Sequence, residues 1–300
     1  MSAILTFVAS NTKKPLTKAH FKEAAEIAKF YNFEITLKPT WLDGDKAADI
    51  VINEFPSTAL LAHFRDTLDK DAIDLFVTAP GNRRKKLLLA DMDSTIVAEE
   101  TLDELAAFAG LKDKVADITA KAMNGELDFH GAVRERVGLL KGLSTDALDK
   151  TLEATIVNPG AKSLVHTMKA NDATCVLVSG GFTVFTGPIA EKVGFDHNHG
   201  NTLGIDGDTL TGEVIDPILD KFAKVEFLDQ YCKDLTLIAD DCMTIGDGAN
   251  DLPMLKKAGL GVGYYAKPSV ALELKNIIKY GDLSAALYAQ GYTDKMIKRF

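Results

Sequence analysis

The chain has 300 residues, of which 46% are hydrophobic and 26% are charged, and its formal net charge at pH 7 is −9. This length accommodates two domains with a sizeable core, and the negative charge argues against nucleic acids or anionic membranes as partners. The sequence contains no apolar run of about 18 residues that could cross a membrane, and the N-terminus lacks the cationic start of a signal peptide. We therefore expect a cytoplasmic protein.

Residues 1–80 are expected to form a separate N-terminal domain. The pattern of apolar residues predicts the order strand, helix, strand, strand, helix, strand, with bounds at 4–9, 17–31, 33–38, 48–53, 57–69 and 73–78. This βαββαβ order is typical of a ferredoxin-like arrangement. It resembles that of ACT-like regulatory domains, although this part of the resemblance depends on element order alone. A module that only holds a homodimer together explains the pattern equally well.

A short basic stretch separates this domain from a second one, which we expect over residues 81–300. It begins with Pro80 and Gly81 and continues as Arg83, Arg84, Lys85 and Lys86. Four basic residues are too few for a nucleic-acid-binding arm. We interpret the stretch as a solvated junction between the domains.

The apolar run at 87–90 predicts a buried parallel strand, and Asp91 and Asp93 follow it directly. In open α/β sheets, ligands bind in the crevice at the carboxyl ends of such strands. Two carboxylates this close raise each other's pKa unless a divalent cation or a shared proton compensates them. Taken alone, the segment fits a solvated turn after a core strand equally well.

Two later segments also consist of an apolar strand followed by residues suited to ligand binding. Residues 175–182 end in a serine and two glycines, which allow backbone N–H groups to approach an anion closely. Residues 243–252 include Asp247, Asn250 and Asp251, which offer the hard oxygen ligands that Mg²⁺ prefers. Lysines at 221 and 224 lie between these segments, where a helical pattern begins.

The remaining regions have less specific patterns. Residues 101–158 have the spacing of a helical insertion, and residues 202–215 predict a β-hairpin flap. We interpret His197 and His199 as surface residues of a polar loop rather than as a metal-binding pair. The three cysteines have no metal-ligand or redox spacing, and Cys175 is expected to be buried and inert.

Taken in order, the AspMetAspSerThr, SerGlyGlyPhe, lysine and GlyAspGlyAlaAsnAsp segments resemble the four motifs of the haloacid dehalogenase-like phosphatases. The resemblance extends over residues 85–295 and is strongest to the phosphoserine phosphatases within that family. It implies an α/β fold with a Rossmann-like core, a parallel sheet and an inserted helical cap at about 101–158. The AlaLysValGluPheLeu context favours Lys224 over Lys221 as the motif lysine.

The resemblance also implies an activity, the Mg²⁺-dependent hydrolysis of O-phosphoserine in serine biosynthesis. Asp91 is the implied nucleophile, which forms an aspartyl-phosphate and so divides hydrolysis into two easier steps. Asp93 is the implied general acid and base. Mg²⁺ would be bound by Asp91, the Asp93 carbonyl and Asp247, with Asp251 orienting the metal site.

Substrate recognition follows from the same resemblance, because phosphoserine carries an ammonium and a carboxylate besides its phosphate. Glu100 matches the substrate-binding glutamate and Arg136 the carboxylate-binding arginine. The other implied contacts are a shielding apolar residue, the phosphate-binding groups and a positioning amide, supplied by Phe129, Lys224, Ser179, Gly180 and Asn250. Without the catalytic motifs nearby, Glu100, Arg134 and Arg136 would fit ordinary helix-surface ion pairs.

Other activities use similar residues. A phosphotransferase or a phosphatase for another small phosphomonoester would have the same motifs. A P-type ion pump shares the aspartyl-phosphate chemistry but needs transmembrane helices, which the sequence lacks. In a different class, the chain would be an amino-acid-sensing binding protein whose N-terminal domain is the functional part. Retention of the charged motif residues favours an enzyme.

Overall fold

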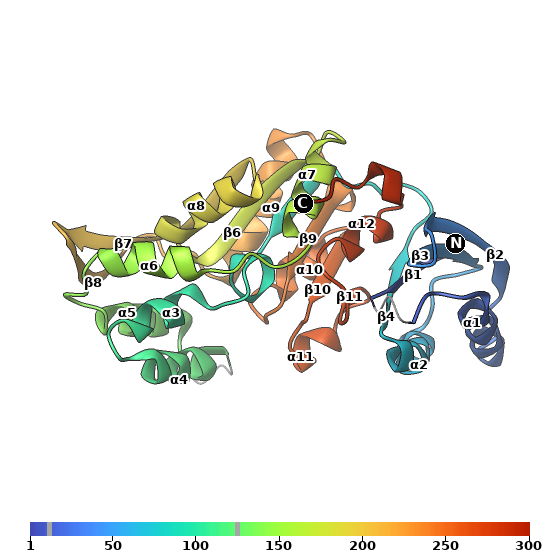
Figure 1. The fold of residues 1–300 in the computed structure, drawn as a ribbon, viewed down its shortest axis with the longest axis horizontal. Coiled ribbons are helices and arrows are strands. Elements are labelled where there is room, and N and C mark those ends of the chain that lie inside the picture. The colour runs from blue at the N-terminus through green and yellow to red at the C-terminus, as the bar shows by residue number, and fades with distance from the viewer. Residues whose placement is uncertain (11–13, 124–126) are drawn as a thin grey trace.

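The protein was analysed as a computed structural model that describes residues 1–10, 14–123 and 127–300, without the side chains of residues 122, 123, 129 and 221. Figure 1 shows the N-terminal sheet at one end, a larger sheet in the middle and a group of helices below the far end of that sheet. Within the described part of the chain, no helix has the length and apolar character needed to cross a membrane.

The N-terminal domain has the predicted βαββαβ order. Its four strands are arranged β2-β3-β1-β4, and all neighbours are antiparallel. The second strand runs to Asp43, beyond the predicted end at residue 38, because it continues to pair with β3 after a bulge. The elements are β1 (Ala3–Ala9), α1 (Lys18–Phe30), β2 (Ile35–Asp43), β3 (Ala47–Ile52), α2 (Thr58–Leu68), η1 (Asp69–Asp71) and β4 (Ile73–Thr78).

The two faces of this sheet pack against different parts of the molecule. One face, with Leu5 and Phe7 of β1, packs against α1 and α2 to form a separate core. On the other face, Val8 and Phe76 belong to the core of the second domain. The N-terminal domain therefore packs against the rest of the chain through one face of its sheet.

The junction between the domains is only partly solvated: Arg84 and Lys86 are exposed as predicted, whereas Arg83 and Lys85 are largely enclosed, so the prediction was wrong for these two residues. The Arg83 guanidinium forms an ion pair with Asp49, with Nη1 2.6 Å from Oδ2, and also donates to the Thr6 hydroxyl at 3.0 Å. Lys85 is only 5% exposed and donates to the carbonyls of Asn82 and Asp240. Arg83 and Lys85 are enclosed because acceptors on other segments, including Asp49 and the Asp240 carbonyl, lie around them.

The central sheet has the order β11-β10-β9-β5-β6-β7-β8. Its neighbours are parallel except for β7 and β8, which form the predicted hairpin. The strand order reverses between β5 and β9, as in Rossmann-like folds. The strands are β5 (Leu87–Ala90), β6 (Thr174–Phe182), β7 (His197–Asp206), β8 (Thr209–Ile215), β9 (Cys242–Gly246), β10 (Leu260–Tyr264) and β11 (Ile277–Ile278).

Helices cover both faces of this sheet, which explains why β5 is apolar at every position. Leu88 and Ala90 face the core with α7, α8 and α12, whereas Leu87 and Leu89 face the core with α9 and α10. The covering elements are α7 (Ala161–Lys169), α8 (Thr183–Val193), α9 (Lys221–Asp234), η3 (Ala239–Asp241), α10 (Leu252–Lys257), α11 (Pro268–Ala271), α12 (Ala285–Ala289) and η4 (Asp294–Met296).

The predicted helical insertion follows β5 as a cap, with four helices among its described residues. Two linker segments connect it to the sheet domain, and they pair with each other through a bridge between Val97 and Val157. The first three of these helices lie below the sheet domain in Figure 1, and the fourth lies closer to the sheet. In chain order, the four helices are α3 (Thr101–Ala107), α4 (Lys112–Met123), α5 (Phe129–Gly138) and α6 (Asp146–Ala154).

The environment of the two histidines differs from the prediction. They lie in strand β7 rather than in a loop. His197 is exposed as expected, but His199 is half-buried and stacks on Phe227 with ring centroids 4.0 Å apart. Pairing of β7 with β6 placed these polar residues in a strand, which their own sequence does not indicate. Cys175 is fully buried, as predicted.

Candidate active site

A cavity of about 380 Å³ lies between the carboxyl ends of the central strands and the cap. Asp91 follows β5 and Asp247 follows β9, so both lie where the strand order reverses. Eight of the predicted site residues line this cavity: Asp91, Asp93, Glu100, Arg136, Ser179, Gly180, Asp247 and Asn250.

Three buried carboxylates form the floor of the site. Oxygens of Asp91, Asp247 and Asp251 all lie within 4.8 Å of one another. The buried Lys224 ammonium donates to Asp91 Oδ1 at 2.6 Å and to Asp251 Oδ1 at 2.5 Å. Lys267, which is 40% exposed, reaches Asp247 from the outside, with Nζ 3.5 Å from Oδ2. Within the described residues, the three carboxylates therefore face a single buried cation.

This charge balance shifts the pKa values of the cluster. Burial and the nearby Asp251 raise the pKa of Asp91 well above its usual value, and the same causes raise the pKa of Asp247. Burial by itself would lower the pKa of Lys224, but the carboxylates of Asp251 and Asp91 outweigh this effect and raise it. Lys224 is thus held as an ammonium, while the carboxylates remain short of positive charge. A hard divalent cation would supply that charge.

Close backbone packing holds the acidic residues together. A Cβ atom on Gly246 would lie 2.5 Å from Asp251 Cγ, so only glycine fits beside this carboxylate. The second oxygen of Asp251 accepts a hydrogen bond from the Gly248 N–H at 3.0 Å. Asp251 is thereby fixed between this loop and Lys224, which agrees with an orienting role behind the metal site.

Asp93 is held by the first residue of the cap. Its Oδ1 accepts from both the N–H and the hydroxyl of Thr101, each at 2.7 Å. Its Oδ2 accepts from the Ser179 hydroxyl at 3.0 Å. The Thr101 N–H can only donate, whereas the Ser179 hydroxyl can rotate and accept, so Oδ2 is the Asp93 oxygen that can carry a proton.

Ser179 lies at the end of β6 and is part of a tight loop. Its hydroxyl accepts a hydrogen bond from the Gly181 N–H at 2.8 Å. The Gly180 carbonyl accepts from the Asn201 side chain at 2.7 Å, and this amide also binds the Leu219 N–H. The loop is thus fixed by a residue of the hairpin strand β7.

The cap contributes one acidic and one basic side chain to the cavity. Glu100 Oε1 accepts from the Ser94 hydroxyl at 2.8 Å, and burial together with the charge of Asp93 raises the pKa of Glu100 to about 7. Arg136 Nη1 donates to the Thr119 hydroxyl at 3.0 Å. Burial lowers the pKa of the Arg136 guanidinium, which is partly compensated by Asp103.

The structure places the remaining predicted residues as follows. Asn250 lines the cavity, and Lys224 rather than Lys221 is shown to reach the acidic cluster. The side chain of Lys221 is outside the described part of the structure. The same applies to Phe129, whose backbone begins α5, so its shielding role stays a prediction.

Sequence reasoning missed four residues that hold the site together: Ser94, Thr101, Thr119 and Asp220. Only Asp220 has a usable signal, because an aspartate before a helical pattern is a preferred N-cap. Its Oδ1 accepts from the N–H groups of Phe222 and Ala223 at the start of α9, the helix that carries Lys224. The other three are hydroxyl residues whose partners lie in other segments.

The fold and the acidic cluster at the strand ends define a hydrolase of the haloacid dehalogenase-like class, and residues 88–256 match the family model of the haloacid dehalogenase-like hydrolases. A probable phosphoserine phosphatase from Schizosaccharomyces pombe is 41% identical over 218 residues, which cover 72% of this chain and 73% of that protein. The chain belongs to the phosphoserine phosphatase family.

Solved structures agree with this assignment. A haloacid dehalogenase family hydrolase from Salmonella enterica serovar Typhi has a TM-score of 0.83 and 26% identity, over 96% of this chain and 98% of that chain. A phosphoserine phosphatase solved as an analogue of its phospho-aspartyl intermediate is 38% identical, with a TM-score of 0.65. That match covers 68% of this chain and 98% of the other. The first of these includes the N-terminal domain, and the second corresponds to a shorter part of the chain.

Proposed function

We propose that this chain is a cytoplasmic phosphoserine phosphatase that hydrolyses O-phosphoserine to serine and phosphate with Mg²⁺, within serine biosynthesis. The observation that carries the proposal is the pairing of two half-sites in one cavity. The core supplies the acidic cluster with Lys224, and the cap supplies Glu100 and Arg136. Each charged group of phosphoserine thus finds a group of opposite charge or a metal site.

The donor set fits Mg²⁺, because the clustered groups are hard oxygen ligands short of positive charge. The proposed ligands are the Asp91 and Asp247 side chains and the Asp93 carbonyl. A bound Mg²⁺ would supply positive charge to the phosphate and to the attacking carboxylate. Asp251 would act behind these ligands, since its two oxygens already bind Lys224 and the Gly248 N–H.

The reaction would begin with attack of an Asp91 carboxylate oxygen on phosphorus. A P–O bond forms to Asp91 as the bond to the serine oxygen breaks, and Asp93 Oδ2 donates its proton to that oxygen. The same Asp93 oxygen then removes a proton from water, which attacks the aspartyl-phosphate and regenerates Asp91. The relative solved as a phospho-aspartyl analogue supports a covalent intermediate of this kind by its likeness.

Lys224 and the loop at Ser179 would bind the transferred phosphoryl group. The Lys224 ammonium already contacts Asp91 Oδ1, so it lies beside the carboxylate that would attack. The Ser179 hydroxyl and the Gly180 N–H would donate to phosphate oxygens, and Asn250 would position the substrate. Asp93 Oδ2 is 3.0 Å from Ser179 Oγ, so a leaving oxygen beside Ser179 would also lie within reach of Asp93.

The cap residues would recognise the amino-acid part of the substrate. Arg136 would bind the carboxylate and Glu100 the ammonium, with the apolar side chain of Phe129 shielding them. Both charged side chains are half-buried and are oriented by hydroxyl partners, Thr119 and Ser94. Preoriented charges of this kind discriminate against phosphomonoesters that lack the two groups.

The test is phosphate release from phosphoserine and from a panel of small phosphomonoesters, with Mg²⁺ present and then chelated. We expect Mg²⁺-dependent turnover that is highest with phosphoserine. Added acceptor alcohols that reduce phosphate release while forming new phosphoesters would identify a phosphotransferase instead. Turnover that survives chelation of Mg²⁺ contradicts the proposal. Equal turnover of phosphoserine and of phosphomonoesters without an amino-acid group also contradicts it. Sedimentation of the full chain tests whether it forms the homodimer that its N-terminal domain leads us to expect.

A further inference from the structure

Two of the three cysteines lie side by side in the structure, although they are ten positions apart in the sequence. Cys232 lies in the last turn of α9, and Cys242 is the first residue of β9. The two residues, hereafter the cysteine pair, have sulfur atoms 3.3 Å apart, and both thiols are free. Their spacing did not indicate this contact, because the contact depends on how residues 233–241 return from the helix to the sheet.

The backbone on both sides of the cysteine pair is fixed by other contacts. Cys242 pairs with Leu87 of the neighbouring strand β5. The Cys232 carbonyl accepts from the Leu237 N–H at 2.8 Å, and the Cys242 thiol donates to the Ile238 carbonyl at 3.4 Å. Helix α9 lies against the central sheet that contains β9 (Figure 1). The two sulfur atoms are therefore held together by the packing of a helix on a sheet.

The two thiols differ in their exposure to solvent. Cys232 is half-buried and is open to a small reagent, whereas Cys242 is fully buried. Burial raises the pKa of the Cys242 thiol, and the contact with Cys232 raises it further, while the nearby Lys85 ammonium partly opposes the shift. Because the thiolate is the attacking form, an external reagent should react with Cys232 first. Cys242 is then the neighbour that completes the reaction.

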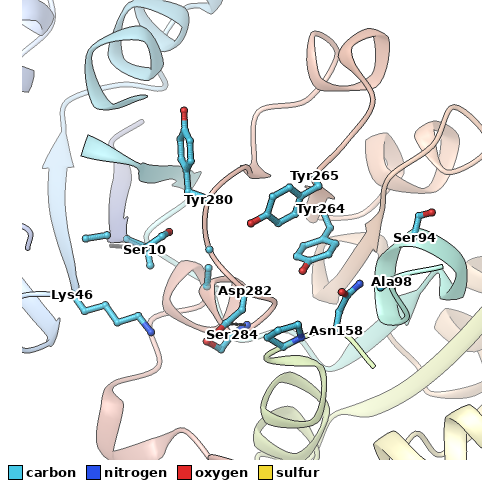
Figure 2. A pocket seen from close by; sticks show the side chains of 15 residues that line it. Ser10, Lys46, Ser94, Ala98, Asn158, Tyr264, Tyr265, Tyr280, Asp282 and Ser284 are labelled. Atoms are coloured by element: carbon cyan, nitrogen blue, oxygen red, sulfur yellow. Dashed lines mark hydrogen bonds between the residues drawn. The ribbon is translucent and has the colours of Figure 1, made fainter. Parts of the chain in front are cut away.

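The cysteine pair lies apart from the candidate active site. Cys242 begins β9, whereas Asp247 follows the other end of that strand, so the pair is at the opposite edge of the sheet from the acidic cluster. Neither cysteine lines the active-site cavity. Neither lines the cavity of about 610 Å³ between the N-terminal and sheet domains, which Lys46, Tyr265 and Asp282 border (Figure 2). A reaction at the pair would therefore obstruct neither cavity.

We propose that the cysteine pair is a reversible modification site that reacts with small disulfides of the oxidised glutathione type. The Cys232 thiolate attacks the small disulfide, which forms a mixed disulfide and releases one thiolate. The Cys242 thiolate then attacks the Cys232 sulfur, which forms the bond between the two cysteines and releases the second thiolate. The two protons lost by the cysteines end on the two released thiols. Two cysteine thiols are thus oxidised, and one small disulfide is reduced.

The bond should stabilise the protein without changing its chemistry. The sulfur atoms need to approach by only about 1.3 Å, which rotation of the two side chains can supply. The bond would close residues 233–241 into a covalent loop and so constrain the unfolded chain. Lys224 lies about two turns before Cys232 on α9, so the bond should leave its contact with Asp91 in place. The inference goes beyond the proposed phosphatase function and does not depend on it.

The first experiment equilibrates the full chain with glutathione buffers of increasing oxidised fraction, blocks the remaining thiols in acid and maps the products by peptide mass spectrometry. Trypsin cleavage after Lys233 places the two cysteines of the pair in different peptides, so the bond appears as a linked peptide pair. We expect this pair to form and to disappear when a dithiol reductant is added. Cys175→Ala removes the third, buried cysteine and is the matched control, which should form the same link.

The second experiment tests whether the fold holds the two thiols ready to react. A bond that stabilises the folded state must form more readily in that state, so the folded chain should become oxidised at a glutathione ratio about tenfold or more below that of the chain in denaturant. Calorimetric melting should show a higher Tm for the oxidised protein than for the reduced protein. Cys232→Ser, at a half-buried position, should remove this difference in Tm. The comparison in denaturant needs no substitution, so it remains decisive if a variant fails to fold.

Three results would overturn the inference: glutathione stays attached to Cys232 without a link to Cys242, the link involves Cys175 or a second chain, or folded and denatured chains are oxidised at the same ratio. An oxidised protein that melts no higher than the reduced one also contradicts it. Phosphoserine turnover should be equal in the two forms. If turnover is absent from both, the proposed phosphatase function fails, while the peptide map still decides the cysteine pair.

Discussion

Two buried charged clusters in this molecule differ in their balance of charge. At the junction between the domains, one guanidinium, Arg83, faces one carboxylate, Asp49, and its remaining N–H groups reach the Thr6 hydroxyl and two backbone carbonyls. At the strand ends, the carboxylates of Asp91, Asp247 and Asp251 share one buried ammonium. The first cluster is neutral and the second is negative.

This difference separates a structural role from a chemical one. A buried ion pair whose charges balance costs little once its hydrogen bonds are satisfied, and losing either partner leaves an uncompensated charge. An unbalanced cluster is unfavourable for folding and persists where its charge is used. We therefore expect opposite results at the two clusters. Substitution at the junction should lower stability without changing the chemistry, and substitution in the acidic cluster should abolish the chemistry without lowering stability.

Asp91→Asn should have the largest effect, because an amide cannot act as the nucleophile. Turnover and covalent phosphorylation should disappear, whereas Asp93→Asn should slow the reaction by about 10²- to 10⁴-fold, the usual share of acid–base catalysis. The metal-free Asp91→Asn protein should nevertheless melt at a higher temperature than the unmodified protein, since one uncompensated carboxylate is gone. Calorimetry and a phosphoryl-enzyme assay measure both effects. Retained turnover would exclude Asp91 as the nucleophile.

Asp49→Ala should cost about 3 to 5 kcal/mol of unfolding free energy, because it leaves Arg83 buried without its partner. The value of kcat for the folded protein should be unchanged. Denaturant unfolding and steady-state kinetics provide the two measurements, and Asp45→Ala, at an exposed turn of the same domain, is the control.

The double variant Asp49→Leu/Arg83→Met sharpens this comparison. It replaces both charges by apolar groups of similar size and should recover much of the lost stability. A loss of kcat in any of these folded variants would mean that the junction contributes to the active site, and the separation of roles would be wrong.

Arg136→Ala should reduce kcat/KM for phosphoserine by about 10- to 100-fold, the range expected for losing a charge-assisted hydrogen bond. A phosphomonoester without a carboxylate should be affected little. Arg134→Ala is a matched control, because Arg134 is exposed on the same helix and pairs with Asp216 at the surface. Equal losses with both substrates would assign Arg136 to folding or to general phosphate binding.

Glu100 should produce the smallest effect, a pH dependence of stability. Burial and Asp93 raise the pKa of Glu100 from 4.5 to about 7, so the folded state retains a proton that the unfolded chain has released. The stability from protonated Glu100 is therefore complete below about pH 4.5 and is lost as the pH rises through about 7. Calorimetric melting of the metal-free protein should show that Glu100→Gln flattens this decline. An identical pH slope in both proteins would contradict the assignment.

The sequence by itself determined the features that depend on local pattern. Strand β5 and the residues that follow it were predictable. An apolar run followed by Asp91 and Asp93 can be recognised without knowledge of any distant partner. The βαββαβ order, the helical cap and the hairpin followed from periodicity in the same way. Lys224 was separable from Lys221 only through the family resemblance of its neighbours, and the structure now shows it against Asp91.

Only the tertiary structure decided which polar residues are buried and what they bind. Arg83 looked like a solvated linker residue because its acceptors, Asp49 and the carbonyls of Tyr288 and Ala289, lie 34 to 206 positions away. The hydrogen bond from Thr101 to Asp93 could not be predicted for a similar reason, since the turn after β5 must bring the two residues together. Local composition fixes strands and helices through short-range sterics and apolar spacing. The partners of a buried charge are fixed by how those elements pack, which no single segment encodes.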